Sequence, residues 1–211
     1  MEMKHGFIKT AAVTPDIRVA DVAYNTESIC RKIDETTAAG AKIVVFPELC
    51  ITGYTCGDLF TQEVLLRDAR KSLHRIAEYT KGKDALIFVG VPLAIDGELY
   101  NVAAALHRGE ILGLTTKTFL PNYGEFYEMR QFRPGPETAR YLMFDGKRTP
   151  FGPQLLFAED TWMRWSYPRK SARMCGHPFR PVSRRQEREL RSSSTVLPVT
   201  RPSGRRLTVP A

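Results

Sequence analysis

The chain changes character near residue 160, and this change limits how much of it can fold. Residues 1–160 carry 19 basic and 21 acidic side chains, whereas residues 161–211 carry 12 basic and two acidic ones. Eleven of those twelve cations are arginine, and six prolines interrupt the same stretch. Such a composition offers too little apolar surface to offset the entropy lost on folding. We therefore predict a folded domain over residues 1–160 and a disordered, arginine-rich tail over residues 161–211.

The first 160 residues show strand and helix patterns in turn. Apolar runs predict strands at 7–13, 43–46 and 85–91, and apolar residues at three- and four-residue steps predict helices at about 22–40 and 62–79. Two further runs, Tyr100–His107 and Ile111–Thr116, flank a short turn containing Gly109, which is typical of a hairpin. This order predicts an α/β fold in which a sheet packs on helices.

Several classes of protein are disfavoured. No apolar run approaches the roughly 18 residues of a membrane span, and Met1–His5 lacks the layout of a signal peptide. We therefore expect a cytoplasmic protein with no membrane partner. The four cysteines lack metal-ligand spacing, so we expect neither a metal site nor a disulfide framework. Cys50 and Cys56 fit small core or loop residues, and a loop thiol near a functional site stays open as an alternative.

Glu48 stands at the end of an apolar strand. The run Ile43–Val45 leads directly into residues 46–54, Phe-Pro-Glu-Leu-Cys-Ile-Thr-Gly-Tyr. An ion in such a place is costly unless it has a partner. Glu48 is therefore either a base at the mouth of a buried strand or a carboxylate that merely starts the next loop. A second segment, residues 115–128, also follows an apolar strand and begins Thr-Thr-Lys-Thr-Phe-Leu-Pro-Asn-Tyr.

Together these two segments resemble the carbon–nitrogen hydrolase (nitrilase) superfamily, whose members use a Glu–Lys–Cys triad. The string Lys117–Glu128 resembles more specifically the glutaminase domain of glutamine-dependent NAD synthetases. The resemblance runs from about Phe7 to about Asp160. It implies an incomplete nitrilase-type four-layer α-β-β-α sandwich, a glutamine or small-amide substrate, and homo-oligomers among the full-length relatives. It implies no cofactor in this chain: ATP would belong to the missing synthetase domain, and no Gly-rich phosphate-binding loop occurs here.

The resemblance also assigns roles to individual residues. Glu48 is the expected general base, Lys117 the cation beside the oxyanion, and Tyr123 a contact for the glutamine substrate. Glu128 either orients Lys117 through charge pairing or is a simple surface carboxylate. We expect Glu48 and Lys117 at neighbouring strand ends, with their side-chain heads within roughly 8 Å of each other.

The expected nucleophile is missing. In the family the cysteine follows an apolar strand in a string like Glu-Ile-Cys-Glu-Asp-Val-Trp, and nothing of that kind occurs here. One codon set for that string and for Ala-Pro-Ile-Pro-Pro after it, read one base out of frame, gives Lys170–Arg180. The lost cysteine codon then lies across Ser171 and Ala172. We therefore expect a frameshifted and truncated C-terminal part, an incidental Cys175, and a chain that is an inactive fragment.

Two other functions stay open. One is a free-standing small-amide hydrolase of the same superfamily, although Asn122–Glu128 matches the fused synthetase type better. The other is non-specific nucleic-acid binding by the tail, whose arginines attract phosphate. The tail lacks the interleaved aromatic residues of a stacking platform, so we expect no specific nucleic-acid partner.

Overall fold

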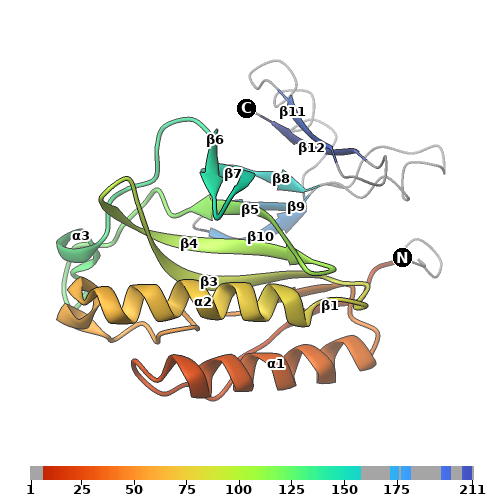
Figure 1. The fold of residues 1–211 in the computed structure, drawn as a ribbon, viewed down its shortest axis with the longest axis horizontal. Helices are drawn as coiled ribbons and strands as arrows, with labels where there is room; N and C mark the ends of the chain where they lie inside the picture. The colour runs from red at the N-terminus through yellow and green to blue at the C-terminus, as the bar shows by residue number, and fades with distance from the viewer. Residues whose placement is uncertain (1–6, 158–171, 176, 182–195, 201–205, 211) are drawn as a thin grey trace.

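The main element of the fold is a mixed seven-stranded sheet. The computed structural model describes residues 7–157, 172–175, 177–181, 196–200 and 206–210. The strand order is β1-β2-β3-β4-β5-β7-β6 (Figure 1). The first three strands are parallel, β4 and β5 follow antiparallel, and β7 runs parallel to β5 with β6 beside it at the edge. Their bounds are β1 Thr10–Ala12, β2 Ile43–Val45, β3 Leu86–Ile95, β4 Glu98–His107, β5 Glu110–Thr116, β6 Arg140–Phe144 and β7 Lys147–Gly152.

Two long helices, α1 (Val22–Ala38) and α2 (Glu63–Tyr79), lie side by side on one face of this sheet (Figure 1). Asp21 caps α1 by accepting a hydrogen bond from the backbone N–H of Tyr24. Gly40, with φ +85°, follows the C-cap in the left-handed conformation that commonly ends a helix. The core between helices and sheet is apolar and includes Ile29, Ile33, Val44, Leu73, Ile76, Ile87, Val89 and Leu106.

Three two-residue turns build the hairpins of the sheet. Asp96-Gly97 joins β3 to β4, Arg108-Gly109 joins β4 to β5, and Asp145-Gly146 joins β6 to β7. In all three turns both residues have positive φ, a geometry that matches the right-handed twist of the strands. The second of these hairpins is the one predicted from the sequence, and an Asp-Gly pair is the sequence signal of the other two.

The opposite face of the sheet carries a second, smaller apolar cluster. β8 (Leu156–Phe157) packs there, and the ring of Phe157 meets Phe88 edge-on with centroids 5.7 Å apart. Backbone pairing continues from β8 to β9 (Ala172–Cys175) and β10 (His177–Pro181). A separate antiparallel pair is formed by β11 (Val196–Thr200) and β12 (Arg206–Pro210).

The predicted α/β class is confirmed, as are both long helices. The described residues supply one helical layer and one large sheet of the expected four-layer sandwich. The disordered tail over residues 161–211 stays a prediction; of this stretch the structure describes only the four short paired strands β9 to β12. The remainder of that prediction, and the boundary at residue 160, lie outside the described residues.

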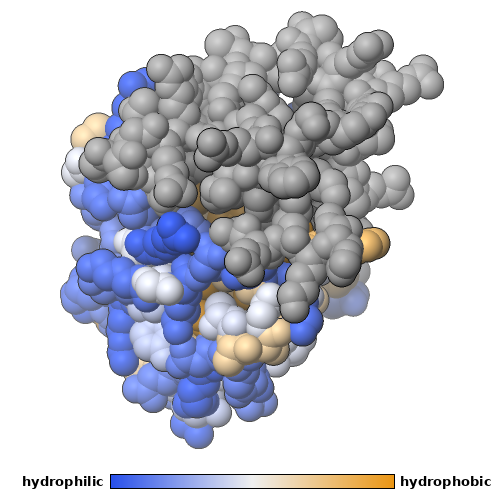
Figure 2. Space-filling model, turned by 90° about the vertical axis from the view of Figure 1, so that its right-hand side faces the viewer, coloured by the Kyte–Doolittle hydropathy of each residue, from blue (hydrophilic) through white to orange (hydrophobic). Residues whose placement is uncertain are grey.

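The described surface is mainly hydrophilic on the face shown in Figure 2, with small apolar areas. Within the described ranges, no helix is both long enough and apolar enough to cross a membrane.

Candidate active site

Glu48 reaches the site because its loop crosses directly over β3. After β2, the backbone N–H of Phe46 donates to the carbonyl of Phe88, and the chain then passes over Gly90. A Cβ at Gly90 would lie 2.4 Å from the Leu49 nitrogen and 2.5 Å from the Pro47 carbonyl oxygen. Only glycine leaves that room, so Gly90 lets the loop carry Glu48 across the sheet toward β4.

Lys117 is the first residue after β5. Its backbone N–H donates to the carbonyl of Asn101 on β4, and its own carbonyl accepts from the N–H of Gly135, both at 2.9 Å. The strands that Glu48 and Lys117 follow are not neighbours, because β3 and β4 lie between β2 and β5. The predicted adjacency of the two strand ends is therefore wrong. The loop that crosses β3 at Gly90 instead brings the Glu48 side chain next to Lys117.

The side chains of Glu48, Lys117 and Glu128 form one ion cluster. Lys117 Nζ lies 2.9 Å from Glu48 Oε1 and 2.8 Å from Glu128 Oε1. This confirms the predicted proximity of Glu48 and Lys117. Burial alone would lower the pKa of Lys117, but its hydrogen bonds to Glu128 and Glu48 raise that pKa above its ordinary value. Lys117 is therefore a fixed cation at neutral pH.

Glu128 begins the short helix α3 (Glu128–Gln131), at the left-hand end of the sheet in Figure 1. Its side chain is 4% exposed, so the surface-carboxylate alternative is wrong and the charge pairing with Lys117 is confirmed. The hydroxyl of Tyr54 also donates to Glu128 Oε1, at 2.6 Å. Burial and then Glu128 raise the pKa of Tyr54, so the phenol keeps its proton. Among the described residues, Glu128 Oε2 is buried without a hydrogen-bond partner.

Tyr123 lies at the surface of the same region. It is 71% exposed, and its ring packs edge-on against Phe126 with centroids 5.8 Å apart. Phe126 in turn meets Tyr54 edge-on at 6.5 Å. A hollow of about 380 Å³ is lined by Tyr54, Phe126 and Glu128, among others. The structure thus connects Tyr123 to the ion cluster through a chain of aromatic rings, and its role toward glutamine stays a prediction.

Two further residues, Asn101 and Tyr54, contact the ion cluster and are not predicted from the sequence. Asn101 Nδ2 donates to Glu48 Oε1 from β4, and Asn101 is only 4% exposed. A buried amide costs free energy without a partner, so a lone amide just before the apolar stretch Val102–Leu106 is the signal that could identify it. Tyr54 stands inside the segment that contains Glu48, yet nothing local shows that its hydroxyl meets Glu128.

The described cysteines do not supply a nucleophile. Cys30, Cys50 and Cys56 are free and buried, which confirms the small-core interpretation of Cys50 and Cys56. Cys50 Sγ faces the carbonyl of Gly90 at 3.6 Å, and burial raises the pKa of Cys50 to about 12. Burial also raises the pKa of Cys30 and of Cys56. All three are protonated thiols at neutral pH. The side chain of Cys175 lies outside the described residues.

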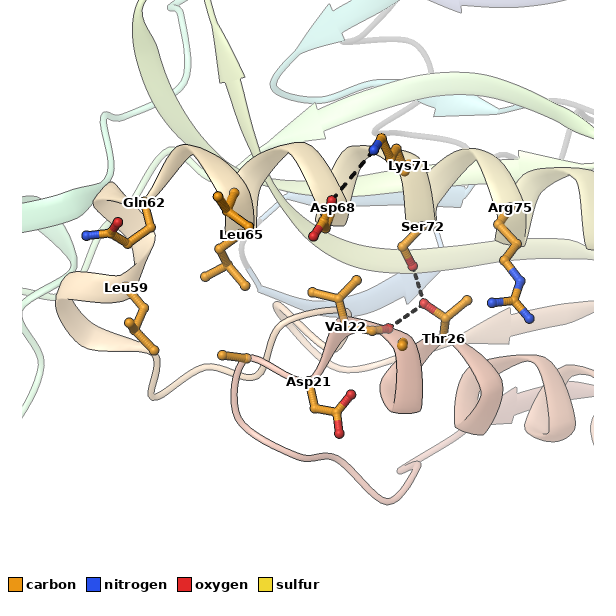
Figure 3. Close-up of a pocket in the computed structure, with 13 residues that line it drawn as sticks. Asp21, Val22, Thr26, Leu59, Gln62, Leu65, Asp68, Lys71, Ser72 and Arg75 are labelled. Atoms are coloured by element: carbon orange, nitrogen blue, oxygen red, sulfur yellow. Dashed lines mark hydrogen bonds and ion pairs between the residues drawn. The ribbon is translucent and has the colours of Figure 1, made fainter.

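A second hollow, of about 660 Å³, lies between α1, α2 and the 3-10 helix η1 (Gly57–Thr61) (Figure 3). Thr26 of α1 and Ser72 of α2 point toward each other there and share a hydrogen bond, and Thr26 donates to the carbonyl of Val22 at 2.6 Å. Lys71 on its rim is 71% exposed. The two hydroxyls are hydrogen-bonded to each other, and Lys71 pairs with Asp68 at 3.8 Å.

Comparison with known proteins gives one family. A family model described as carbon-nitrogen hydrolase matches residues 9–162. A glutamine-dependent NAD(+) synthetase from Mycobacterium leprae is 35% identical over 153 residues, which are 72% of this chain and 22% of that protein. The crystal structure of a glutamine-dependent NAD(+) synthetase from Cytophaga hutchinsonii has a TM-score of 0.68 and 30% identity, over 72% of this chain and 26% of that one.

A more distant structural relative shows the fold alone. An amidase of the nitrilase superfamily from Nesterenkonia AN1 has a TM-score of 0.52 and 23% identity, over 67% of this chain and 53% of that one. The chain spans about a quarter of the length of the curated relatives it matches.

Proposed function

The chain belongs to the carbon–nitrogen hydrolase family, and from this premise we propose that it carries the base and the cation of a glutamine amidohydrolase site. Such a site would release ammonia for use in NAD synthesis. The similarity to the glutamine-dependent synthetases of Mycobacterium leprae and Cytophaga hutchinsonii supports glutamine as the amide.

One observation carries the proposal: Lys117 is clamped between two carboxylates of different exposure. Glu128 is buried, whereas the Glu48 side chain is 40% exposed and open to a substrate. Glu48 can therefore exchange a proton while Glu128 holds Lys117 in place. A cation fixed in this way can stabilise the oxyanion that develops when an amide carbonyl is attacked.

The chemistry follows from these positions. Glu48 takes the proton of a thiol, the sulfur bonds to the amide carbon, and the C–N bond breaks as ammonia leaves with a proton. Water then attacks the thioester with Glu48 as its base, the C–S bond breaks, and the acid leaves while the sulfur regains its proton from Glu48. The chain's own residues supply proton transfer and charge stabilisation in these steps.

The thiol is the part that this chain does not supply among its described residues. We propose that the segment carrying the nucleophile in relatives is replaced after residue 160 by frameshifted sequence. Two observations support this: the family match ends at residue 162, and Lys170–Arg180 equals an out-of-frame translation of the expected cysteine motif. The 211-residue chain would then be inactive toward glutamine.

The test is to restore the reading frame near codon 161 and measure ammonia release from glutamine. The restored chain should be active, and E48Q in that chain should lower the rate by roughly 10² to 10⁴, the usual contribution of a general base. E137Q, at an exposed glutamate outside the cluster, is the matched control and should keep the rate. Full activity of E48Q would contradict the assignment. Turnover of small aliphatic amides without glutamine would favour the free-standing amidase.

A further inference from the structure

Asn101 contacts both charged members of the site from a single position on β4. Its side-chain amide donates to Glu48 Oε1, and its backbone carbonyl accepts the N–H of Lys117 at 2.9 Å. Asn101 itself is 4% exposed, so its end of each bond is shielded from water. Asn101 therefore links the base to the strand that also fixes the main chain of the cation.

Glu48 needs such a link because it stands on a loop. Its side chain is 40% exposed, and an ion pair at that exposure is screened and leaves the carboxylate free to rotate. The Asn101 amide and the Lys117 ammonium both bond to Oε1. Two donors on one oxygen restrain the rotation of the carboxylate, and both of these bonds are made to Oε1 rather than Oε2. Fixing a catalytic group in this way lowers the entropy cost of the reaction.

We infer that Asn101 is the positioning residue of the base, holding the Glu48 carboxylate against Lys117 through Oε1. The catalytic role of this positioning rests on the proposed function. The positioning itself rests on the contact between Asn101 and Glu48. A buried amide in a strand is destabilising unless it is hydrogen-bonded. The partner that this amide has is the functional carboxylate.

The test measures the reactivity of Lys117 in the intact 211-residue chain. Three groups face its ammonium: Glu48 from the loop after β2, Glu128 from α3, and the phenol of Tyr54 behind Glu128. Asn101→Leu removes the donor and keeps the branched shape and the number of heavy atoms of the side chain. It should free Glu48, lower the pKa of Lys117, and raise the fraction of free amine. Acetylation of Lys117 by acetic anhydride, followed by mass spectrometry, should then become about threefold faster or more.

The internal reference for labelling is Lys71, whose rate should not change because its side chain is 71% exposed. In an E48Q background, Asn101→Leu should have no further effect on Lys117, because the carboxylate it positions is gone. An equal acceleration in both backgrounds would show an effect transmitted through the fold and would overturn the inference. Unchanged labelling in Asn101→Leu would overturn it as well.

Asn101→Val is a second variant for the case in which the leucine variant fails to fold, because valine favours the strand conformation. It should accelerate labelling of Lys117 in the same direction. Loss of the folded circular dichroism spectrum in both variants would assign Asn101 a structural role and overturn the inference. The labelling experiment does not measure glutamine turnover. A negative labelling result therefore leaves the proposed glutaminase chemistry untouched, and a lack of glutamine turnover leaves a positive labelling result valid.

Discussion

Gly90→Ala is the substitution that tests most directly how the fold positions Glu48 beside Lys117. The new Cβ would stand 2.4 Å from the Leu49 nitrogen, 2.5 Å from the Pro47 oxygen and 2.8 Å from the Glu48 carbonyl carbon. All three are backbone atoms, so no side-chain rotation can relieve the contact. Ordinary van der Waals contact begins at 3.4 Å, so the loop must move away from β3 by about 1 Å.

The energetic cost follows from that displacement. Overpacking a well-packed interior costs about 1–3 kcal/mol, and a clash with backbone belongs at the upper end of that range. Alanine recovers roughly 0.5–1 kcal/mol relative to glycine within a strand. The net expectation is a loss of about 2 kcal/mol in the free energy of unfolding. The same movement should lift Glu48 from Lys117.

Urea unfolding of the wild type, G90A and G113A measures the effect. Gly113 on β5 is the matched control, because it is also a strand glycine without positive φ. Its nearest neighbours, at 3.1 Å, are side-chain atoms of Leu155 and Phe157 rather than backbone, and they need to shift by only a few tenths of an ångström. G113A should therefore cost less than about 1 kcal/mol. Two results would refute the idea that a glycine is required at position 90 because the Glu48 loop crosses there. One is equal stability of G90A and the wild type, and the other is an equal loss of stability in G90A and G113A.

Two other substitutions have defined outcomes. E128Q removes one partner of a buried ion pair and should lower the free energy of unfolding, measured in urea, by about 3 kcal/mol. The control E137Q, at an exposed position, should change that free energy by less than about 0.5 kcal/mol. Similar losses for the two variants would contradict the buried pairing of Glu128 with Lys117. Burial alone would raise the pKa of Asp84, but hydrogen bonds from Lys42 and Arg108 lower it to about 2. Because the folded-state pKa is depressed, the stability difference between the wild type and D84N should be present above about pH 4. It should disappear as the pH falls toward about 2, and a pH-independent difference would count against this pairing.

The sequence predicts those features that depend on local pattern. The three- and four-residue spacing of Val22, Thr26, Ile29 and Ile33 predicts α1, and the last three are buried in it. Glu48 follows its strand within a few residues, so its place at a strand end could also be read from the chain. These features depend on backbone geometry within one element.

The features that the sequence does not predict depend on contacts between distant elements. The crossing at Gly90 depends on how a loop packs on a strand some forty residues later, and glycine in a strand has several explanations. The hydrogen bond from Tyr54 to Glu128 joins residues 74 positions apart along the chain. The pairing of β9 to β12 also joins separate segments, and the bulk composition of residues 161–211 gives no signal for it.

Ammonia release from glutamine by the 211-residue chain as it stands tests the central claim most directly. The claim is that Glu48 and Lys117 form a prepared base and cation without a nucleophile. The predicted result is no release above the buffer rate, both for the chain and for Cys175→Ala. Release by the chain that is lost in Cys175→Ala would make Cys175 the nucleophile and contradict the frameshift account.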